Sequence, residues 1–267
     1  MTTAVRMTYI GGPTVLLEWG GVRLLTDPTF DPSGTSYHTP SYTLRKTMDP
    51  TIGLDALGPL DAILLSHDHH FDNLDRAGRA LVNRIEPVFT TVAGASRLSG
   101  GTIGLAPWQS TEITAPSGRI LKITATPAQH GPAYADRGPV IGFVLGFEDD
   151  PSDQIYLSGD TVWFEGVRRV SERYPVRVAV LFMGAARVPV VGDWPLTFTA
   201  SEGVETARAF PDATVVPVHY EGWEHFSESS ADIAQMFEQA GLGYRLCWLP
   251  AGRPTDVEAV LPSSLPR

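Results

Sequence analysis

The sequence predicts a protein of mixed α/β (α+β) class, built as a four-layer αββα sandwich with two facing β-sheets and helices outside. Two observations favour this fold. Short strand patterns separated by glycine-containing turns open the chain, at 5–10, 14–19 and 22–27. From residue 62 onward, strand patterns alternate with helical patterns, as in sheets that carry helices on their outer faces.

The remaining elements follow from hydrophobic periodicity and from glycine and proline positions. Further strands are predicted at 62–66, 87–91, 120–128, 140–147, 154–160, 176–184, 214–220 and 244–250. Helices are predicted at 73–85, 162–173, 200–210 and 229–240. Thr199 and Glu202 form a capping box before the third helix. Residues 28–59 are rich in Pro, Gly, Ser and Thr, which predicts a long surface loop.

Composition indicates a packed protein, and we expect residues 1–267 to form one domain. Apolar residues make up 43% and charged residues 19% of the chain, which is ordinary for a globular protein. The formal charge of -10 disfavours a nucleic-acid partner. No apolar run reaches the roughly 18 residues of a membrane span, and no signal-peptide pattern is present. These features predict a cytoplasmic protein; they do not predict its oligomeric state.

One segment, ILLSHDHHFDNLD at 63–75, carries most of the chemical information. It places three of the seven histidines directly behind a predicted buried strand. His67 and His69 alternate across one residue, so in an extended chain both imidazoles point to the same side. Three other predicted strands end at His130, Asp160 and His219. Because functional groups gather at strand ends on one edge of layered folds, we expect these side chains to converge.

Converging imidazoles and carboxylates predict a metal site. With Cys247 as the only cysteine, the ligands must be nitrogen and oxygen atoms. Such a set suits Zn²⁺, with Mn²⁺ or Fe²⁺ as alternatives, and one or two ions are expected. Each histidine alone could instead be a polar residue satisfied at a strand end. Their recurrence at matching positions favours the metal.

Several residues of the segment and its surroundings keep two interpretations. Asp72 is either a metal ligand or the N-cap of the following helix. His70 either supports the site from beside a ligand or is exposed, with direct ligation as a further alternative. His225 either lines the pocket or is solvated. Tyr220 and Asn73 also lie where they could border the site.

These residues and their order resemble the metallo-β-lactamase fold superfamily. The resemblance rests on H-D-H-H-F-D-N at 67–73, Gln129-His130, Ser158-Gly159-Asp160 and His219. The opening segment from Tyr9 to Phe30 is similar to the branch that contains L-ascorbate-6-phosphate lactonase and N-acylphosphatidylethanolamine phospholipase D. The resemblance implies a metallo-β-lactamase-like fold. It also implies that His67, His69 and His130 hold a first metal, that Asp160 bridges two metals, and that His219 helps to hold the second.

The motif departs from the family's H-x-H-x-D-H pattern at its second half. Phe71 stands in the place of the family's Asp and Asp72 in the place of its last His. Alternatively one residue is inserted, and Asp72 and Asn73 replace the Asp-His pair. Both alignments leave the second metal one imidazole short, so we expect it to bind more weakly.

The resemblance and the ligand set together predict a metal-dependent hydrolase. The expected nucleophile is a metal-bound hydroxide, acting on a small ester, lactone or phosphodiester substrate. Asp72 and Asp160 would orient the attacking water and carry its proton. Two alternatives stay open: a di-iron redox protein of the same fold, and a binding or regulatory protein that has lost catalysis.

Overall fold

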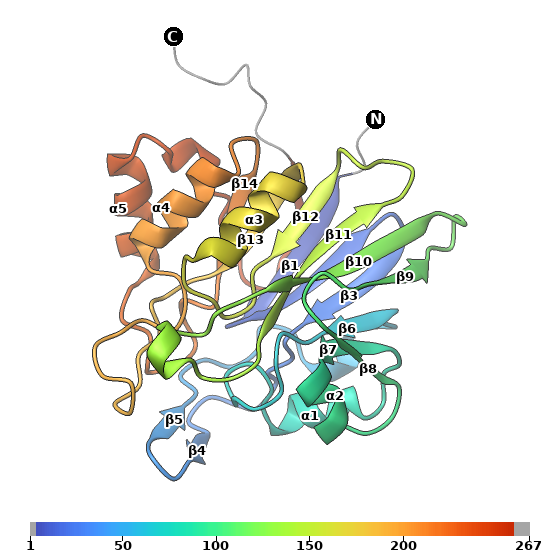
Figure 1. Ribbon diagram of the computed structural model, residues 1–267. Helices are drawn as coiled ribbons and strands as arrows, with labels where there is room; N and C mark the ends of the chain where they lie inside the picture. The colour runs from blue at the N-terminus through green and yellow to red at the C-terminus, as the bar shows by residue number, and fades with distance from the viewer. Residues whose placement is uncertain (1–3, 259–267) are drawn as a thin grey trace.

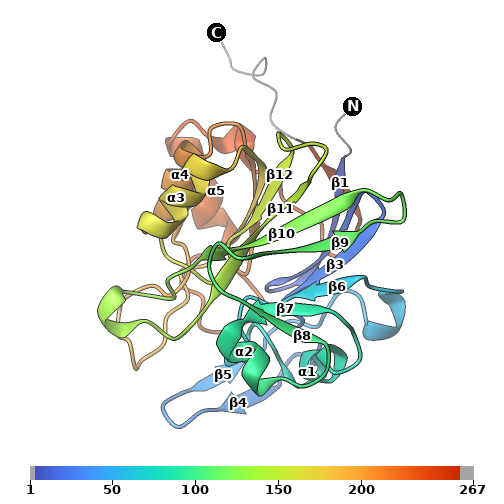
Figure 2. The same cartoon turned by 45° about the vertical axis from the view of Figure 1, so that its right-hand side comes forward.

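The computed structural model describes residues 4–258. Two β-sheets face each other and helices cover the outer side of each, as Figures 1 and 2 show from two directions. One sheet has the strand order β15-β1-β2-β3-β6-β7-β8 and the other β14-β13-β12-β11-β10-β9. The predicted four-layer αββα sandwich is therefore confirmed. The expectation of one domain over 1–267 extends beyond the described residues and stays a prediction.

The first sheet combines an antiparallel amino-terminal part with a parallel part. Its strands are β1 (Val5–Gly11), β2 (Thr14–Trp19), β3 (Val22–Thr26), β6 (Ala62–Leu64), β7 (Val88–Thr91), β8 (Thr102–Leu105) and β15 (Thr255–Val257). Strands β1, β2 and β3 form the predicted meander, whereas β3, β6, β7 and β8 pair in parallel. Helices α1 (Arg76–Val82) and α2 (Val92–Arg97) follow β6 and β7 and form the crossover connections between these parallel strands.

The second sheet follows the same plan in the carboxyl-terminal half. Its strands are β9 (Ser110–Thr114), β10 (Ile120–Pro127), β11 (Ile141–Phe147), β12 (Gln154–Leu157), β13 (Val176–Phe182) and β14 (Thr214–Val218). Helices α3 (Glu165–Arg173), α4 (Ala200–Ala209) and α5 (Ser230–Gln239) pack on its outer face. No helix in the described part of the chain is long and apolar enough to cross a membrane.

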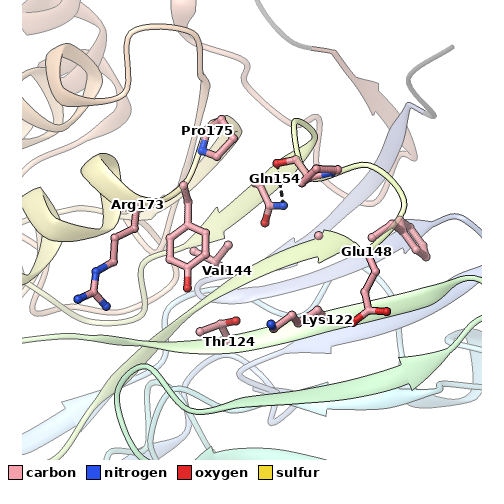
Figure 3. Close-up of a pocket in the computed structure, with 11 residues that line it drawn as sticks. Lys122, Thr124, Val144, Glu148, Gln154, Arg173 and Pro175 are labelled. Carbon is pink, nitrogen blue, oxygen red and sulfur yellow. Dashed lines mark hydrogen bonds between the residues drawn. The ribbon is translucent and has the colours of Figure 1, made fainter.

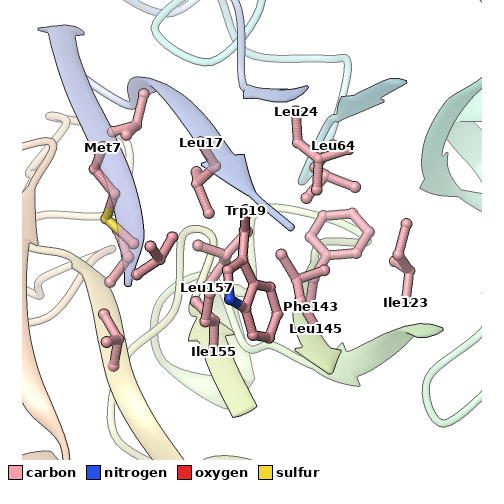
Figure 4. Packing of buried hydrophobic residues seen from close by; sticks show 14 of the residues in the cluster. Met7, Leu17, Trp19, Leu24, Leu64, Ile123, Phe143, Leu145, Ile155 and Leu157 are labelled. Carbon is pink, nitrogen blue, oxygen red and sulfur yellow. The ribbon is translucent and has the colours of Figure 1, made fainter. Parts of the chain in front are cut away.

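The main core lies between the two sheets. Figure 4 shows Met7, Leu17 and Trp19 of the first sheet facing Leu145 and Leu157 of the second. Alternate residues of each strand point inward, so both inner faces are apolar. This packing fixes the sheets relative to each other and thereby fixes the strand ends that carry the histidines.

The helices differ from the prediction mainly at their starts. Helix α4 begins after Thr199, and the Thr199–Glu202 capping box is present as predicted. The predicted helix 73–85 begins only at Arg76, because Asp75 is its N-cap and accepts the Gly78 N–H at 2.8 Å. Asp72 is therefore not the cap. The predicted helix 162–173 begins at Glu165.

The expected surface loop at 28–59 is only partly a loop. It contains β4 (Ser36–His38), β5 (Thr43–Arg45) and the 3-10 helix η1 (Leu54–Ala56). Tyr37 is fully buried, because its ring packs against Phe71 at 4.6 Å and Trp223 at 5.6 Å between centroids. Residues 36–46 thus form a packed segment, called the flap below, that lies against Phe71.

The predicted strand at 244–250 is wrong. This segment begins with the 3-10 helix η3 (Gly243–Arg245), and its backbone pairs with the sheet only at a single bridge between Leu246 and Val215. The buried guanidinium of Arg245 donates to the carbonyl groups of Ala207 and Ala213. These bonds fix the segment against α4 instead of in the sheet. The other short 3-10 helix, η2, spans Ala133–Ala135.

Candidate metal centre

Four strand ends meet at one edge of the sandwich. His67, His69 and His70 follow β6 of the first sheet, whereas His130, Asp160 and His219 follow β10, β12 and β14 of the second. His67, Asp160 and His219 are fully buried. The structure thus brings together groups that are far apart in the sequence, as the pattern of strand ends predicted.

Hydrogen bonds on the outer side of the cluster fix two imidazoles in one tautomer. His130 Nδ1 lies 2.9 Å from the carbonyl oxygen of Leu196, which can only accept, so Nδ1 carries the proton. His67 Nδ1 donates to Ser66 Oγ at 2.9 Å, since that hydroxyl donates its own proton to Asp27 Oδ1 at 2.6 Å. The Nε2 atoms of both imidazoles therefore carry lone pairs, as metal ligation requires.

A carboxylate oxygen faces these two lone pairs. Asp160 Oδ2 is buried without a hydrogen-bond partner. It lies 3.9 Å from His67 Nε2 and 3.6 Å from His130 Nε2. Two ligands of one tetrahedral zinc ion stand roughly 3.3 Å apart. With small adjustments these three residues fit a divalent ion. Such an ion would also give the buried Asp160 Oδ2 the partner that it lacks.

A hydrogen bond also fixes the tautomer of His69, but here Nδ1 is the nitrogen that is left free. Its Nε2 lies 2.8 Å from the carbonyl oxygen of Arg137 and must donate. Its Nδ1 therefore carries the lone pair, and this atom is buried without a partner. Ligand atoms of His67, His69 and His70 lie within 4.8 Å of one another.

His70 lies in the middle of the cluster. Its Nδ1 is 2.9 Å from His67 Nε2 and 3.1 Å from His130 Nε2. Burial and neighbouring imidazoles lower the pKa values of His67 and His70 well below the ordinary value, so both rings are neutral at pH 7. Neutral imidazole is the form that binds metal.

A second group of side chains lies next to the cluster described above and consists of Asp72, His219 and His225. His225 Nε2 donates to Asp72 Oδ2 at 2.9 Å, and His219 Nε2 lies 3.7 Å from the same oxygen. Burial alone would raise the pKa of Asp72, but His225 and His219 hold it well below its ordinary value. Burial also works to lower the pKa of His219, yet the carboxylates of Asp160 and Asp72 raise it to about 10.

The second group is less complete than the first as a metal site. Asn73 Nδ2 donates to Asp160 Oδ1 at 3.3 Å, and His219 Nδ1 donates to the same oxygen at 3.0 Å. Asn73 thus supports Asp160 and does not turn toward Asp72. Among residues 4–258, the groups of three ligand-type side chains within 4.8 Å of one another contain neither Asp72 nor His219.

Tyr220 lies apart from the cluster. Its ring stacks on Tyr9 with 6.4 Å between centroids and meets the edge of Trp248 at 5.5 Å. A separate hollow on the second sheet, shown in Figure 3, is bordered by Lys122 and Arg173 and includes none of the candidate ligands.

Arg137, which the sequence did not predict as a site residue, lines a pocket at the mouth of the site. Residues 38–42 and 136–138 line a pocket together with His69 and His70. Arg137 Nη2 lies 3.5 Å from Tyr42 Oη, and its Nε is buried without a hydrogen-bond partner. A cation is therefore poised beside the cluster. Its position in a loop between two predicted strands gave no periodic signal.

Asp27 was missed as well, although a signal existed. It stands at the end of a predicted strand, just as the candidate ligands do. It accepts hydrogen bonds from the backbone N–H and the hydroxyl of Ser66. Burial raises the pKa of Asp27 to about 8. Its role is to hold Ser66, which in turn orients His67.

Comparison with known proteins agrees with this geometry. The family model described as the beta-lactamase superfamily domain matches residues 22–220. The UPF0173 protein YddR of Bacillus subtilis is 24% identical over 253 residues, covering 89% of this chain and 94% of its own. A UPF0173 metal-dependent hydrolase of Pyrobaculum aerophilum is also 24% identical, over 237 residues, covering 88% of this chain and 92% of its own.

Solved structures share the fold over nearly the whole chain. An isothiocyanate hydrolase from Delia radicum gut bacteria superposes with a TM-score of 0.79 at 24% identity, covering 96% of this chain and 100% of that one. A possible metal-dependent hydrolase from Veillonella parvula gives a TM-score of 0.80 at 20% identity, covering 95% and 100%. The family match spans most of the chain, from β3 to the residue after His219. This protein therefore belongs to the beta-lactamase superfamily domain family, whose relatives include proteins named metal-dependent hydrolases.

Proposed function

We propose that this protein hydrolyses a small ester, lactone or phosphodiester with the help of one or two divalent metal ions, zinc being the first choice and Mn²⁺ or Fe²⁺ the alternatives. One observation carries the proposal. Lone pairs on His67 Nε2, His69 Nδ1 and His130 Nε2 are set by hydrogen bonds on the far side of each ring. A fourth donor, Asp160 Oδ2, is buried beside two of them without a partner.

The chemistry follows from that arrangement. A divalent ion supplies Lewis acidity and lowers the pKa of bound water from about 15.7 toward about 7. Asp160 keeps Oδ2 toward the first group because His219 and Asn73 hold its other oxygen. Asp72 lies next to the first group with its carboxylate held by His225. Its ionised form is positioned to orient an attacking water and accept its proton.

The mouth of the site supports a small substrate. The guanidinium of Arg137 would recognise an anionic group, which favours a phosphodiester or an acidic lactone over a neutral ester. The structural similarity to an isothiocyanate hydrolase adds isothiocyanates to the classes worth testing. Membership of the branch of ascorbate-phosphate lactonase and the phospholipase D stays a prediction, as do the single domain and the cytoplasmic location.

The test is the His130→Ala variant. We expect its metal content, measured by elemental analysis, to fall together with hydrolysis of a panel of phosphodiesters, lactones, esters and isothiocyanates. The control is Glu172→Ala: Glu172 lies exposed on α3, where its carboxylate pairs with Arg168, away from the candidate ligands. Full metal occupancy in the His130 variant would contradict the proposed site. Loss of metal without loss of hydrolysis would contradict the proposed mechanism.

A further inference from the structure

We propose that His70 is a direct ligand of the metal held by His67, His69 and His130, which makes it a fourth imidazole at that position. In the motif H-x-H-x-D-H, as this sequence matches it, position 70 is a spacer with no assigned role. The inference deepens the proposed function and rests on the metal centre proposed there.

The first argument counts protons. His67 Nε2 and His130 Nε2 both carry lone pairs, because the opposite nitrogen of each ring donates outward. His70 Nδ1 lies 2.9 Å and 3.1 Å from these two atoms. It can carry at most one proton, so it cannot make two full hydrogen bonds. A cation shared by the three nitrogens satisfies all of their lone pairs, and a small outward adjustment brings the two distances to the roughly 3.3 Å between ligands of one tetrahedral ion.

The second argument concerns how the chain positions this ring. The carbonyl oxygen of His70 accepts the N–H groups of Asn73 and Leu74 at 3.3 Å and 3.0 Å, which closes a turn directly after the H-x-H pair. The next side chain, Phe71, leaves the cluster and stacks on Tyr37. Because the turn sends Phe71 outward, the His70 ring is directed inward. It borders both the mouth pocket and the small cavity that contains Asp72 and His130.

If His70 is not a ligand, removing its ring should change metal binding in the opposite direction. If His70 Nδ1 only shares one proton between His67 and His130, it competes with the metal for their lone pairs. Removing the ring would then strengthen metal binding. If His70 is a ligand, its removal weakens binding.

The experiment titrates Co²⁺ alone into the metal-free full-length protein, as wild type, His70→Ala and the control Glu172→Ala, which removes an exposed carboxylate on α3. We expect the Kd of His70→Ala to rise at least about tenfold, since even the loss of a group that only orients a ligand costs this much. The Glu172 variant should bind Co²⁺ as wild type does. An unchanged or lower Kd in His70→Ala overturns the inference.

A measurement on the wild type covers the case in which the variant does not fold. At one equivalent of Co²⁺, ring protons of a bound imidazole show large contact shifts in the proton NMR spectrum. We expect His70 ring protons to shift as strongly as those of His67 and His130. Shifts confined to the other three imidazoles overturn the inference and leave the proposed function intact. A wild type that binds no metal overturns both.

Discussion

Among single residues, the site depends on groups that lie behind the candidate ligands. The carbonyl oxygens of Leu196 and Arg137 and the hydroxyl of Ser66 decide which nitrogen of each imidazole is free. A ligand held in the right tautomer and orientation loses less entropy when it binds. The metal affinity of this protein should therefore depend on these outer hydrogen bonds as well as on the ligands.

Ser66→Ala tests that dependence. It removes the acceptor for His67 Nδ1 and the hydroxyl that donates to Asp27 Oδ1, but keeps the backbone N–H bond of residue 66 to the same oxygen. We expect metal affinity to fall by about 10- to 100-fold, measured by competition with a chromophoric chelator. Ser171→Ala, on the exposed side of α3, serves as the control. Equal affinities in both variants would show that His67 needs no orienting partner.

A second prediction concerns Arg137 and the charge of the substrate. Removing a charge-assisted hydrogen bond costs about 1.5–3 kcal/mol, so Arg137→Ala should reduce kcat/KM for an anionic substrate by roughly tenfold or more. The loss should appear mainly in KM, and Arg137→Lys should recover part of it. A neutral ester of the same size is the control and should be affected little. Equal losses for both substrates would argue against recognition of an anion.

The sequence predicted the ligand-type residues at the strand ends because strand patterns are local and His67, His130 and Asp160 each follow one. It could not predict the inward position of His70, since that depends on Phe71 stacking on Tyr37 in a flap expected to be a loop. The partner of His130 is a backbone carbonyl 66 residues away. No residue type signals such a contact.

At the scale of elements, the start of α1 is tied to the flap. Asp75 caps the helix and also accepts from Lys46 Nζ at 3.1 Å, and both side chains are buried, with 0% and 5% of their surface exposed. Removing one partner of a buried ion pair lowers the stability of a protein much more than replacing both partners by apolar residues does. This contact therefore couples the flap to the helix that follows the proposed metal-binding segment.

Asp75→Ala should lower the free energy of unfolding by about 3–5 kcal/mol, because Lys46 is left buried without its counter-charge. Ser229→Ala is the comparison: Ser229 caps α5 at an exposed position, and its loss should cost about 1 kcal/mol. Urea unfolding of both variants measures the difference. Similar losses would mean that Lys46 finds another partner.

Periodicity predicted the longer strands and helices, whereas the short elements escaped it. Strands β8, β9 and β15 and helix α2 have between three and six residues and include polar or small side chains. Their structure depends on pairing with neighbours, as β8 pairs with β7. The segment 244–250 had the apolar pattern of a strand, but the hydrogen bonds of Arg245 to α4 and the segment after it prevail.

At the scale of the whole molecule, the site joins the two sheets. His67, His69 and His70 come from the first sheet, and His130 and Asp160 from the second. In the metal-free protein several buried imidazoles therefore face one another. This arrangement makes stability depend on pH and on metal.

The pH dependence of the metal-free protein has two sides. Burial lowers the pKa values of His67, His69 and His70 below 6.5, so the unfolded chain binds more protons than the folded one in acid. Stability should fall as the pH drops from about 7 to 5. His219 has its pKa raised to about 10, so its contribution is lost as the pH rises from 6.5 toward 10. Urea midpoints at pH 5, 7 and 9 should be highest at pH 7; a steady rise toward pH 9 would contradict this.

Metal should hold the two sheets together, because the proposed ligands come from both sheets. A ligand that binds only the folded state stabilises it by about 2.7 kcal/mol at 100 times its Kd. Adding a chelator to the wild type should therefore lower the unfolding temperature, and restoring excess Zn²⁺ should recover it. In His130→Ala the chelator should change the unfolding temperature little, since this variant has lost the proposed imidazole ligand of the second sheet. If the chelator lowers the unfolding temperature equally in both proteins, the stabilising ion is bound somewhere other than between these strand ends.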